Sequence, residues 1–264
     1  MENLSSNNIQ KKYAVITGAS SGIGMEFAKQ LSNKGYPLVL IARREDRLKA
    51  LTEQVNTECK IITADLSEIE ECKRVSKAIE NIEVEIFINN AGFGDCGKFI
   101  ESSVEKELDM IQVNISAFHF FTKQILKKMQ ENDRGYILNV ASSAGLLPAG
   151  PFMSTYYATK AYVASLTRGV AEELNQSSSN VYIGCLCPGP VNTEFNDVAN
   201  VEFALKGISA EYCVEYTLTQ MKKKKVVIVP TMQLKLATVF GRLIPSKLCI
   251  KITAHQQKKK MQPY

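Results

Sequence analysis

Short apolar runs rich in valine and isoleucine alternate along this chain with longer stretches of amphipathic spacing. The short runs are typical of buried strands, whereas apolar residues that recur every three or four positions are typical of helices. This alternation predicts βα units joined into a parallel sheet. The expected strands span residues 13–17, 38–42, 60–64, 85–89, 136–140, 181–187 and 226–229. The expected helices span residues 23–33, 44–56, 69–80, 104–131, 154–175 and 210–221.

The order of these segments predicts the fold class and one main domain. We expect an α/β fold with a Rossmann-like, doubly wound, parallel seven-stranded sheet and helices on both faces. Residues 1–230 form the single domain in this prediction, and residues 231–264 form a basic amphipathic C-terminal extension. With 45% hydrophobic and 22% charged residues, the composition excludes intrinsic disorder for the chain as a whole.

Charge is distributed unevenly along the chain. Residues 1–221 carry 21 Lys and Arg against 27 Asp and Glu, whereas residues 222–264 carry 11 Lys and Arg and no acid. An acidic body with a basic tail predicts that the tail meets an anionic surface or folds over an acidic face. We favour packing on the protein's own body or on a partner subunit. A weak membrane-surface contact through residues 231–264 stays open, and we expect no nucleic-acid partner.

The first residues and the cysteines indicate a compartment. Residues 1–12 are polar and lack the apolar core of a secretory signal, and no apolar run approaches the ~18 residues that span a bilayer. Seven irregularly spaced cysteines and two histidines form no metal-ligand pattern, so we expect no metal. These features predict a reducing, cytoplasmic location, with peripheral membrane contact as the open alternative.

A glycine-rich turn follows the first expected strand and opens a helix. Its sequence, residues 18–24, has the spacing GxxxGxG. Glycines let the backbone approach a pyrophosphate, and a helix start supplies free N–H groups and positive partial charge. An ordinary strand–turn–helix junction is the alternative interpretation. The predicted phosphate contacts are Gly18, Ser20, Ser21, Gly22, Ile23 and Gly24.

Two arginines follow the second expected strand. Enzymes that use NAD usually place a carboxylate at this point to bind the ribose 2′-hydroxyl, but here the first acids, Glu45 and Asp46, come after Arg43 and Arg44. A guanidinium can bind a 2′-phosphate through two parallel hydrogen bonds. The sequence therefore predicts NADP(H) as the cofactor, with Arg43 as the preferred contact. Two solvated arginines remain the alternative.

Several ordered motifs together resemble the short-chain dehydrogenase/reductase family. They are TGASSGIG at 17–24, Asp65-Leu66, NNAG at 89–92, Asn114, Ser143, YYATK at 156–160 and PGPVNT at 188–193. The resemblance covers residues 12–230. It implies a dinucleotide-binding catalytic domain that works as a homodimer or homotetramer on a small carbonyl or alcohol substrate.

The resemblance also implies further cofactor contacts. Asp65 and Leu66 would hold the adenine, although Asp65 alone could also cap the following helix. The residues implied beside the rest of the cofactor are Asn90, Ala91 and Gly92. Those implied to cover the nicotinamide are Pro188, Gly189, Val191 and Thr193.

Tyr156 and Lys160 are four residues apart on an expected helix, so their side chains share one face. A phenol ordinarily has a pKa near 10, and a nearby ammonium is expected to lower it. This pair predicts a tyrosine acid/base. Tyr157 has alanine at the corresponding position and is expected to pack instead.

Two further residues complete the predicted catalytic set. Ser143 lies thirteen residues before Tyr156 at the end of the fifth expected strand, and its hydroxyl can polarise a substrate carbonyl. The family spacing favours it over Ser142. On physics alone Asn114 would be a packing residue in a helix, but the resemblance implies that it orients a water joined to Lys160.

These residues predict reversible hydride transfer between the nicotinamide and a carbonyl carbon or secondary alcohol, without a metal. Residues 146–153 are nearly all apolar and residues 194–208 include several apolar side chains, which favours a hydrophobic substrate such as a steroid, fatty acyl or aromatic ketone. Ordinary pocket lining or packing between subunits is the alternative interpretation of these apolar residues. Two alternatives remain: a non-catalytic NADP(H)-binding sensor, and a peripheral membrane-binding protein of the same fold.

Overall fold

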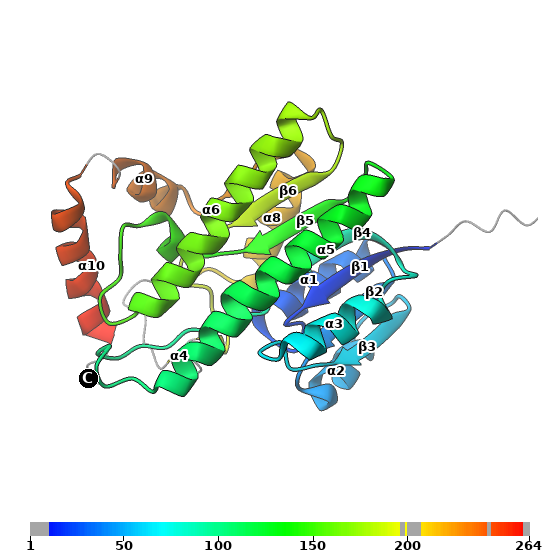
Figure 1. Cartoon of the computed structure of the whole chain (residues 1–264), viewed down its shortest axis with the longest axis horizontal. Helices are drawn as coiled ribbons and strands as arrows, with labels where there is room; N and C mark the ends of the chain where they lie inside the picture. The colour runs from blue at the N-terminus through cyan, green and yellow to red at the C-terminus, as the bar shows by residue number, and fades with distance from the viewer. Residues whose placement is uncertain (1–10, 196–198, 200–206, 242–243, 261–264) are drawn as a thin grey trace, which may run out of the picture.

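The fold is built on one parallel sheet of seven strands, as predicted (Figure 1). The computed structural model describes residues 11–195, 199, 207–241 and 244–260. The strand order is β3-β2-β1-β4-β5-β6-β7, and each strand is parallel to its neighbours. The strands are β1 Lys12–Thr17, β2 Leu38–Ala42, β3 Cys59–Thr63, β4 Glu83–Asn89, β5 Tyr136–Val140, β6 Tyr182–Leu186 and β7 Val227–Ile228.

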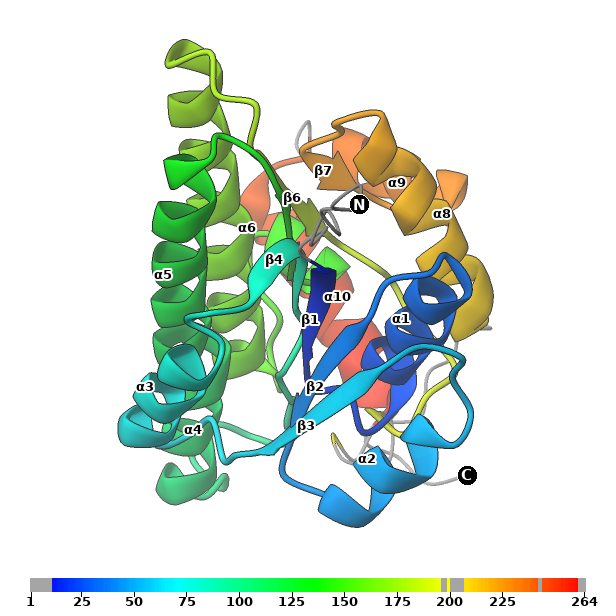
Figure 2. The same ribbon diagram turned by 90° about the vertical axis from the view of Figure 1, so that its right-hand side faces the viewer.

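Helices cover both faces of the sheet, which explains why its strands read as nearly continuous apolar runs (Figure 2). Ala14 and Ile16 of β1 pack with the helices of one face, and Tyr13 and Val15 pack with those of the other. The first layer contains α1 Gly22–Asn33, α2 Glu45–Thr52 and α8 Ala210–Lys222. The second contains α3 Ile69–Ala78, α5 Phe118–Glu131 and α6 Ser154–Gln176.

The strand order reverses direction around β1, which pairs with β2 on one side and with β4 on the other. Connections therefore leave the carboxyl ends of β1 and β4 in opposite directions and open a crevice between them. In a doubly wound sheet this is where a ligand binds.

The single helix expected over residues 104–131 is interrupted. The structure has α4 Val104–Ile111, a π-helical turn Gln112–Ala117, and then α5. Asn114 lies in the π-helical turn, where its amide forms hydrogen bonds with the backbone of Phe93. A π-helical turn adds a residue to the helix, and it frequently marks a functional site.

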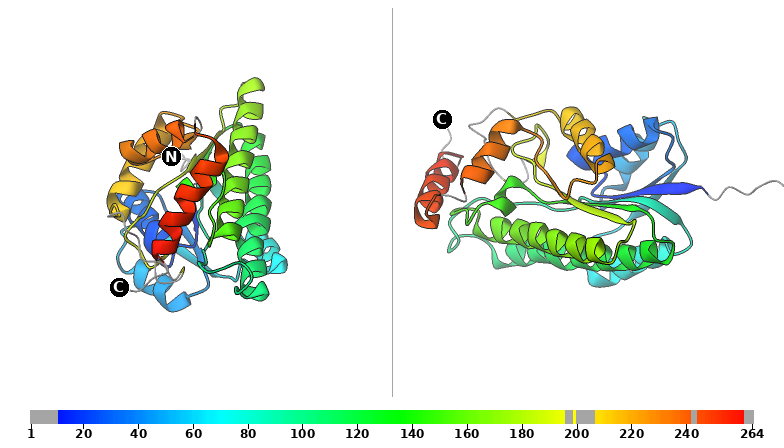
Figure 3. Two further views of the ribbon diagram at one scale, coloured as in Figure 1. Left: turned by 90° about the vertical axis from the view of Figure 1, so that its left-hand side faces the viewer. Right: turned by 90° about the horizontal axis from the view of Figure 1, so that it is seen from above.

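The tail forms two helices that lie beyond the carboxyl end of the sheet, α9 Met232–Phe240 and α10 Ser246–Lys260 (Figures 1 and 3). One face of α10 is packed on the protein, since Cys249, Thr253 and Gln257 are all buried. The favoured expectation that the tail packs on the protein's own body agrees with this arrangement. The opposite face of α10 carries exposed residues such as Lys251.

Candidate active site

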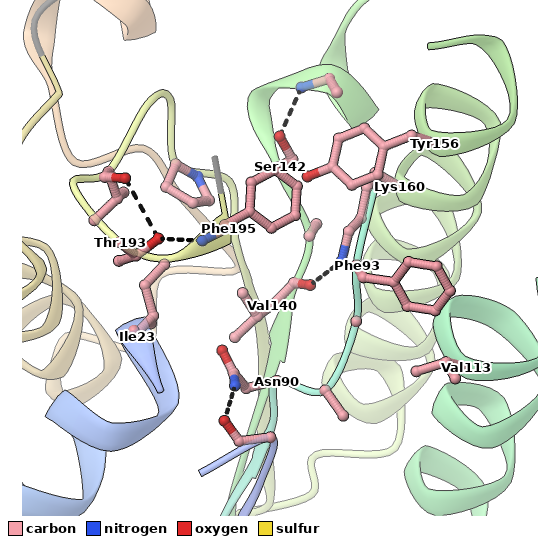
Figure 4. Close-up of a pocket in the computed structure, with 18 of the residues that line it drawn as sticks. Ile23, Asn90, Phe93, Val113, Val140, Ser142, Tyr156, Lys160, Thr193 and Phe195 are labelled. Atoms are coloured by element: carbon pink, nitrogen blue, oxygen red, sulfur yellow. Dashed lines mark hydrogen bonds between the residues drawn. The ribbon is translucent and has the colours of Figure 1, made fainter. Parts of the chain in front are cut away.

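A cavity of about 630 Å³ lies at the carboxyl ends of the central strands. Its walls come from the turn after β1, the segments after β4 and β5, the start of α6, and the tail helices. Figure 4 shows Tyr156, Lys160 and Ser142 on one side of it, with Asn90 and Ile23 on another. Most predicted site residues line this cavity, and the two that do not are Gly24 and Asn114.

The glycine turn after β1 has the shape that a phosphate loop requires. Gly18 and Gly22 have φ values of +65° and +54°, which favour glycine over residues with a side chain. A Cβ on Gly24 would lie 2.3 Å from the Gly18 carbonyl oxygen, so α1 could not approach the turn with a larger residue there. Ser21 caps α1 without a side-chain hydrogen bond to it. The first N–H groups of α1 thus suit a phosphate of the cofactor.

Asn90 ties this turn to the end of β4. Its Nδ2 donates to the carbonyl oxygens of Thr17 at 3.0 Å and Gly18 at 3.2 Å. The backbone N–H groups of Asn90 and Ala91 donate to the Thr17 hydroxyl at 2.9 and 3.0 Å. Because the amide of Asn90 is used in this way, it holds the turn in place and its neighbours Ala91 and Gly92 line the cavity.

The two arginines after β2 both line the cavity, and they have different partners. Arg44 donates from Nε and Nη2 to the Ser20 hydroxyl, at 3.3 and 3.2 Å, and also contacts Glu194. Arg43 lies 3.8 Å from Asp65 and its side chain is 69% exposed. Both guanidinium groups therefore border the region between the phosphate turn and the segment after β3, where cations suit a 2′-phosphate.

Asp65 does not cap α3, because the residue before α3 is Glu68. Its Oδ1 accepts hydrogen bonds from the backbone N–H and the hydroxyl of Ser67, at 3.0 and 2.8 Å. Asp65 thus stabilises the turn between β3 and α3, and Leu66 follows it into the cavity wall. The helix-cap alternative for Asp65 is wrong.

The hydroxyl that faces Tyr156 belongs to Ser142 (Figure 4). Ser142 Oγ also accepts a hydrogen bond from the Ala144 N–H at 3.2 Å. Ser143 lines the same cavity, but its hydrogen bond runs from its backbone N–H to the Pro188 carbonyl at 2.8 Å. The expected preference for Ser143 therefore does not agree with the geometry. The reason is that Ser142 is extended, with φ −169° and ψ 161°, and Ser143 begins a 3₁₀ turn.

Tyr156 and Lys160 are both buried, and burial dominates their protonation. Burial raises the pKa of Tyr156 to about 12, against a smaller lowering by the Ser142 hydroxyl. Burial lowers the pKa of Lys160 to about 8. The expected lowering of the Tyr156 pKa by the ammonium is therefore not found: the opposing contribution comes from the Ser142 hydroxyl, and desolvation exceeds it. At neutral pH the Tyr156 hydroxyl is protonated and can serve as an acid.

Lys160 is held between Tyr156 and the end of β5. Its Nζ donates to the Val140 carbonyl oxygen at 3.0 Å and lies 5.8 Å from the Tyr156 ring centroid. Phe195 packs against the same ring, with centroids 5.6 Å apart. The position of the phenol is therefore fixed by a charged group on one side and an aromatic ring on the other.

Asn114 lies behind this pair. Its amide accepts from the Phe93 N–H at 3.1 Å and donates to the Phe93 carbonyl at 2.9 Å and the Thr159 hydroxyl at 3.1 Å. A Cβ on Gly92 would lie 2.8 Å from Asn114 Oδ1 and 3.2 Å from Lys160 Nζ. Asn114 and Lys160 are thus brought together, but the amide of Asn114 is committed to protein partners.

The remaining predicted residues follow β6. Pro188, Gly189, Val191 and Thr193 line the cavity. A Cβ on Gly22 would lie 3.1 Å from the Thr193 Cβ, so this segment reaches the phosphate turn.

The described residues contain neither a metal site nor a membrane-spanning helix. No group of three or more His, Cys, Asp or Glu side chains there could hold a metal ion. Within the same residues, no helix is long and apolar enough to cross a membrane.

Comparison with known proteins agrees with this arrangement. The family described as short chain dehydrogenase matches residues 12–202. The very-long-chain 3-oxoacyl-CoA reductase of Anas platyrhynchos is 33% identical over 200 residues, which is 72% of this chain but only 63% of that protein. An uncharacterised oxidoreductase of Staphylococcus epidermidis is 32% identical over 218 residues, with 80% of this chain and 93% of the relative covered.

The solved structures include a short-chain dehydrogenase from Sphingobium yanoikuyae in complex with NADPH. It is 28% identical and superposes with a TM-score of 0.79, covering 88% of this chain and 93% of the other. The family match, the parallel sheet and the arrangement of Tyr156 and Lys160 all indicate the same family. This chain belongs to the short-chain dehydrogenase/reductase family.

Proposed function

We propose that the protein is an NADP(H)-dependent oxidoreductase that transfers hydride between the nicotinamide and the carbonyl or secondary alcohol of a hydrophobic compound. The observation that carries this proposal is the buried Tyr156 hydroxyl, which faces Ser142 and lies next to Lys160 in the cavity that contains the glycine turn. The bound cofactor supplies or accepts the hydride.

The side chains handle the proton and the charge on oxygen. In the reducing direction, Tyr156 donates its proton to the substrate oxygen while the Ser142 hydroxyl donates a hydrogen bond to it. The resulting phenolate is stabilised by the Lys160 ammonium. In the oxidising direction, the same phenolate accepts the proton of the alcohol.

The preference for NADP(H) rests on charge. Arg43 and Arg44 border the cavity, and no acid follows β2 directly. Glu194 contacts Arg44 but follows β6, so it does not take the place of the ribose-binding carboxylate. We infer that Arg43, which is more exposed and has only a 3.8 Å contact with Asp65, binds the 2′-phosphate. Arg44 holds Ser20 beside it.

The hydrophobic substrate is supported by the end of the cavity around Tyr156. Apart from the catalytic residues, most side chains there are aromatic or aliphatic. They are Phe93, Leu147, Met153 and Phe195, which pack in one cluster with Tyr156. A relative that reduces 3-oxoacyl-CoA, as its name states, also acts on a long apolar chain.

The test is a panel of ketones and alcohols assayed with NADPH, NADH and their oxidised forms. We expect reduction of apolar ketones with a preference for NADPH, and a loss of that preference in Arg43→Ala. We expect Tyr156→Phe to lose at least ~10³-fold in turnover while it still binds NADPH. Tyr162→Phe is the matched control, because its hydroxyl contacts His119 on an exposed part of the molecule.

Three outcomes would separate the alternatives. NADPH binding without turnover of any compound would favour a non-catalytic sensor. Equal rates with NADH would overturn the assigned cofactor preference. Undiminished turnover in Tyr156→Phe would overturn the assignment of the acid.

We propose further that the outer face of the tail makes a weak contact with an anionic membrane surface, and that the enzyme works in the cytoplasm as a homodimer or homotetramer. The membrane contact is favoured by apolar side chains that α9 and α10 leave exposed beside lysines. The apolar ones are Met232, Leu236, Phe240, Leu248 and Ile252, exposed by 69%, 49%, 58%, 51% and 46%.

A further inference from the structure

A buried glutamine of the tail is bonded to the tyrosine next to Tyr156. Gln257 of α10 is 3% exposed, and its Nε2 donates to the Tyr157 hydroxyl at 2.6 Å. The other amide atom, Oε1, is buried and accepts no hydrogen bond from the residues that the structure describes. Buried side-chain polar atoms almost always have a partner, so this oxygen needs an explanation.

Both residues line the cavity that contains Tyr156. Tyr156 and Tyr157 are consecutive on α6, with ring centroids 6.4 Å apart and ring planes at 74°. Met153 and Leu147, which also line this part of the cavity, are apolar. The Tyr157–Gln257 pair is therefore a second polar position near the reacting hydroxyl, in surroundings that are otherwise mainly apolar.

The pair offers a donor and an acceptor at one place. Burial raises the pKa of Tyr157 to about 12, so its hydroxyl stays protonated at neutral pH. Because that oxygen accepts from Gln257, its hydrogen is free to be donated elsewhere, while Oε1 is free to accept. If the amide is turned by 180°, Tyr157 donates to Oε1 and the Nε2 group becomes the free donor, with the Tyr157 oxygen as acceptor.

We propose that Tyr157 and Gln257 form a subsite that binds a hydroxyl group of the substrate, apart from the carbonyl that Tyr156 reduces. A hydroxyl both donates and accepts, so it satisfies the pair in either orientation of the amide. The substrate is then an apolar ketone that carries a second, hydroxyl oxygen. This inference rests on the proposed function, since it names the substrate class of the same cavity.

The subsite also gives the tail a part in recognition. Residues 231–264 contain none of the predicted catalytic residues, yet α10 brings Gln257 to Tyr157 across 100 positions of sequence. Leu234 of α9 lines the same cavity. The tail helices thus form part of the wall against which the body of the substrate lies.

The test compares aliphatic ketones that carry a terminal hydroxyl with their deoxy counterparts, over a series of chain lengths. We expect the wild-type protein to prefer the hydroxylated member at one or more lengths by at least ~10-fold in kcat/KM. In Gln257→Leu and in Tyr157→Phe, the ratio of kcat/KM for the hydroxylated ketone to that for its deoxy counterpart falls to about 1. The double variant shows no further loss, because the two residues bind one hydroxyl group. His255→Ala is the control, since His255 is exposed on the same helix and does not line the cavity.

Binding provides a second readout that does not depend on turnover. Calorimetric titration of the protein loaded with NADP⁺, which cannot reduce a ketone, should give the same preference for the hydroxylated member. Melting temperatures and NADPH affinity of each variant check that the fold is retained. If Gln257→Leu does not fold, Tyr157→Phe, which removes only an oxygen, carries the test.

The failures of the two proposals are distinguishable. If the wild-type protein reduces ketones but shows no preference at any chain length, the subsite is overturned and the proposed function stands. A preference that both variants keep would overturn the subsite as well. If the wild-type protein reduces no ketone with either cofactor, the proposed function is overturned first.

Discussion

Two neighbouring serines show how finely the site depends on the backbone. Ser142 and Ser143 both line the cavity, but the hydroxyl of Ser142 faces Tyr156. The extended backbone of Ser142 continues the direction of β5, whereas Ser143 already belongs to the 3₁₀ turn Ser143–Leu146. Counting residues back from Tyr156 could not find this, because the count depends on the length of the loop between the serine and α6.

This difference gives the first prediction. We expect Ser142→Ala to lower kcat by about 10²-fold, because a hydrogen bond to the developing alkoxide is lost. Ser143→Ala should change kcat by less than ~5-fold, since the hydrogen bond of Ser143 to Pro188 is made by the backbone N–H, which alanine keeps. Steady-state kinetics of the two variants with one ketone decide the matter. The reverse order of effects would restore Ser143 as the catalytic serine.

Lys160 provides a prediction on stability. Its pKa falls from 10.5 to about 8 on burial, so between these values the unfolded chain binds more protons than the folded one at this residue. The contribution of Lys160 to the free energy of unfolding therefore rises with pH over this window, by up to ~3 kcal/mol. Urea unfolding at pH 8 and pH 10 should show a smaller rise in Lys160→Met than in the wild-type protein.

The difference between Lys160→Met and the wild-type protein separates the contribution of Lys160 from that of the other groups that titrate at high pH. Lys251→Met serves as a control, because this lysine is exposed on α10. An identical pH dependence in Lys160→Met and the wild-type protein would show that burial does not shift Lys160.

At the scale of elements, the sequence predicts the sheet well and the interruptions poorly. The alternation of apolar runs and amphipathic stretches is a local signal, so it predicts all seven strands. The π-helical turn has no such local signal. It depends on contacts between Asn114 and Phe93, 21 positions apart, and with Thr159, 45 positions apart. The same holds for Gln257, whose partner Tyr157 is 100 positions away.

The π-helical turn gives a second prediction on stability. Asn114 is 1% exposed, and replacing it with alanine would leave both backbone groups of Phe93 without this partner. We expect Asn114→Ala to lower the free energy of unfolding by ~2–4 kcal/mol, because three hydrogen bonds are lost and partly buried backbone groups are left unpaired. Urea unfolding measures this loss. Asn180→Ala, on the surface, is the control, and an equal effect of both changes would contradict the prediction.

At the scale of the whole molecule, charge and chemistry are separated. Residues 1–221 carry a net charge of −6 and contain every predicted catalytic residue, while residues 222–264 carry +11. The charge pattern predicts that the tail has a separate role but not where it lies. In the structure, the inner face of α10 packs on the protein through Cys249, Thr253 and Gln257. The outer face remains, and its composition is apolar and basic.

This outer face makes a last prediction about binding. An exposed helix face with apolar residues among lysines is suited to the interfacial region of an anionic bilayer. A symmetric contact with a second copy would instead bring together two tails, in each of which residues 231–264 carry a net charge of +7, and this is electrostatically unfavourable. We expect the protein to sediment with vesicles that contain phosphatidylglycerol and to be released from them by high salt. It should not bind vesicles of phosphatidylcholine alone.

Negative charge introduced at exposed apolar residues of the tail tests whether this face makes the membrane contact. Leu236→Glu combined with Ile252→Glu should abolish sedimentation, because both side chains lie on the exposed face of the tail. Phe99→Glu is the matched control, since Phe99 is 68% exposed but lies outside the tail. Light scattering on the same samples reports oligomeric state. If the double variant loses a dimer and the wild-type protein binds no vesicles, the exposed face is a subunit contact and the membrane proposal is overturned.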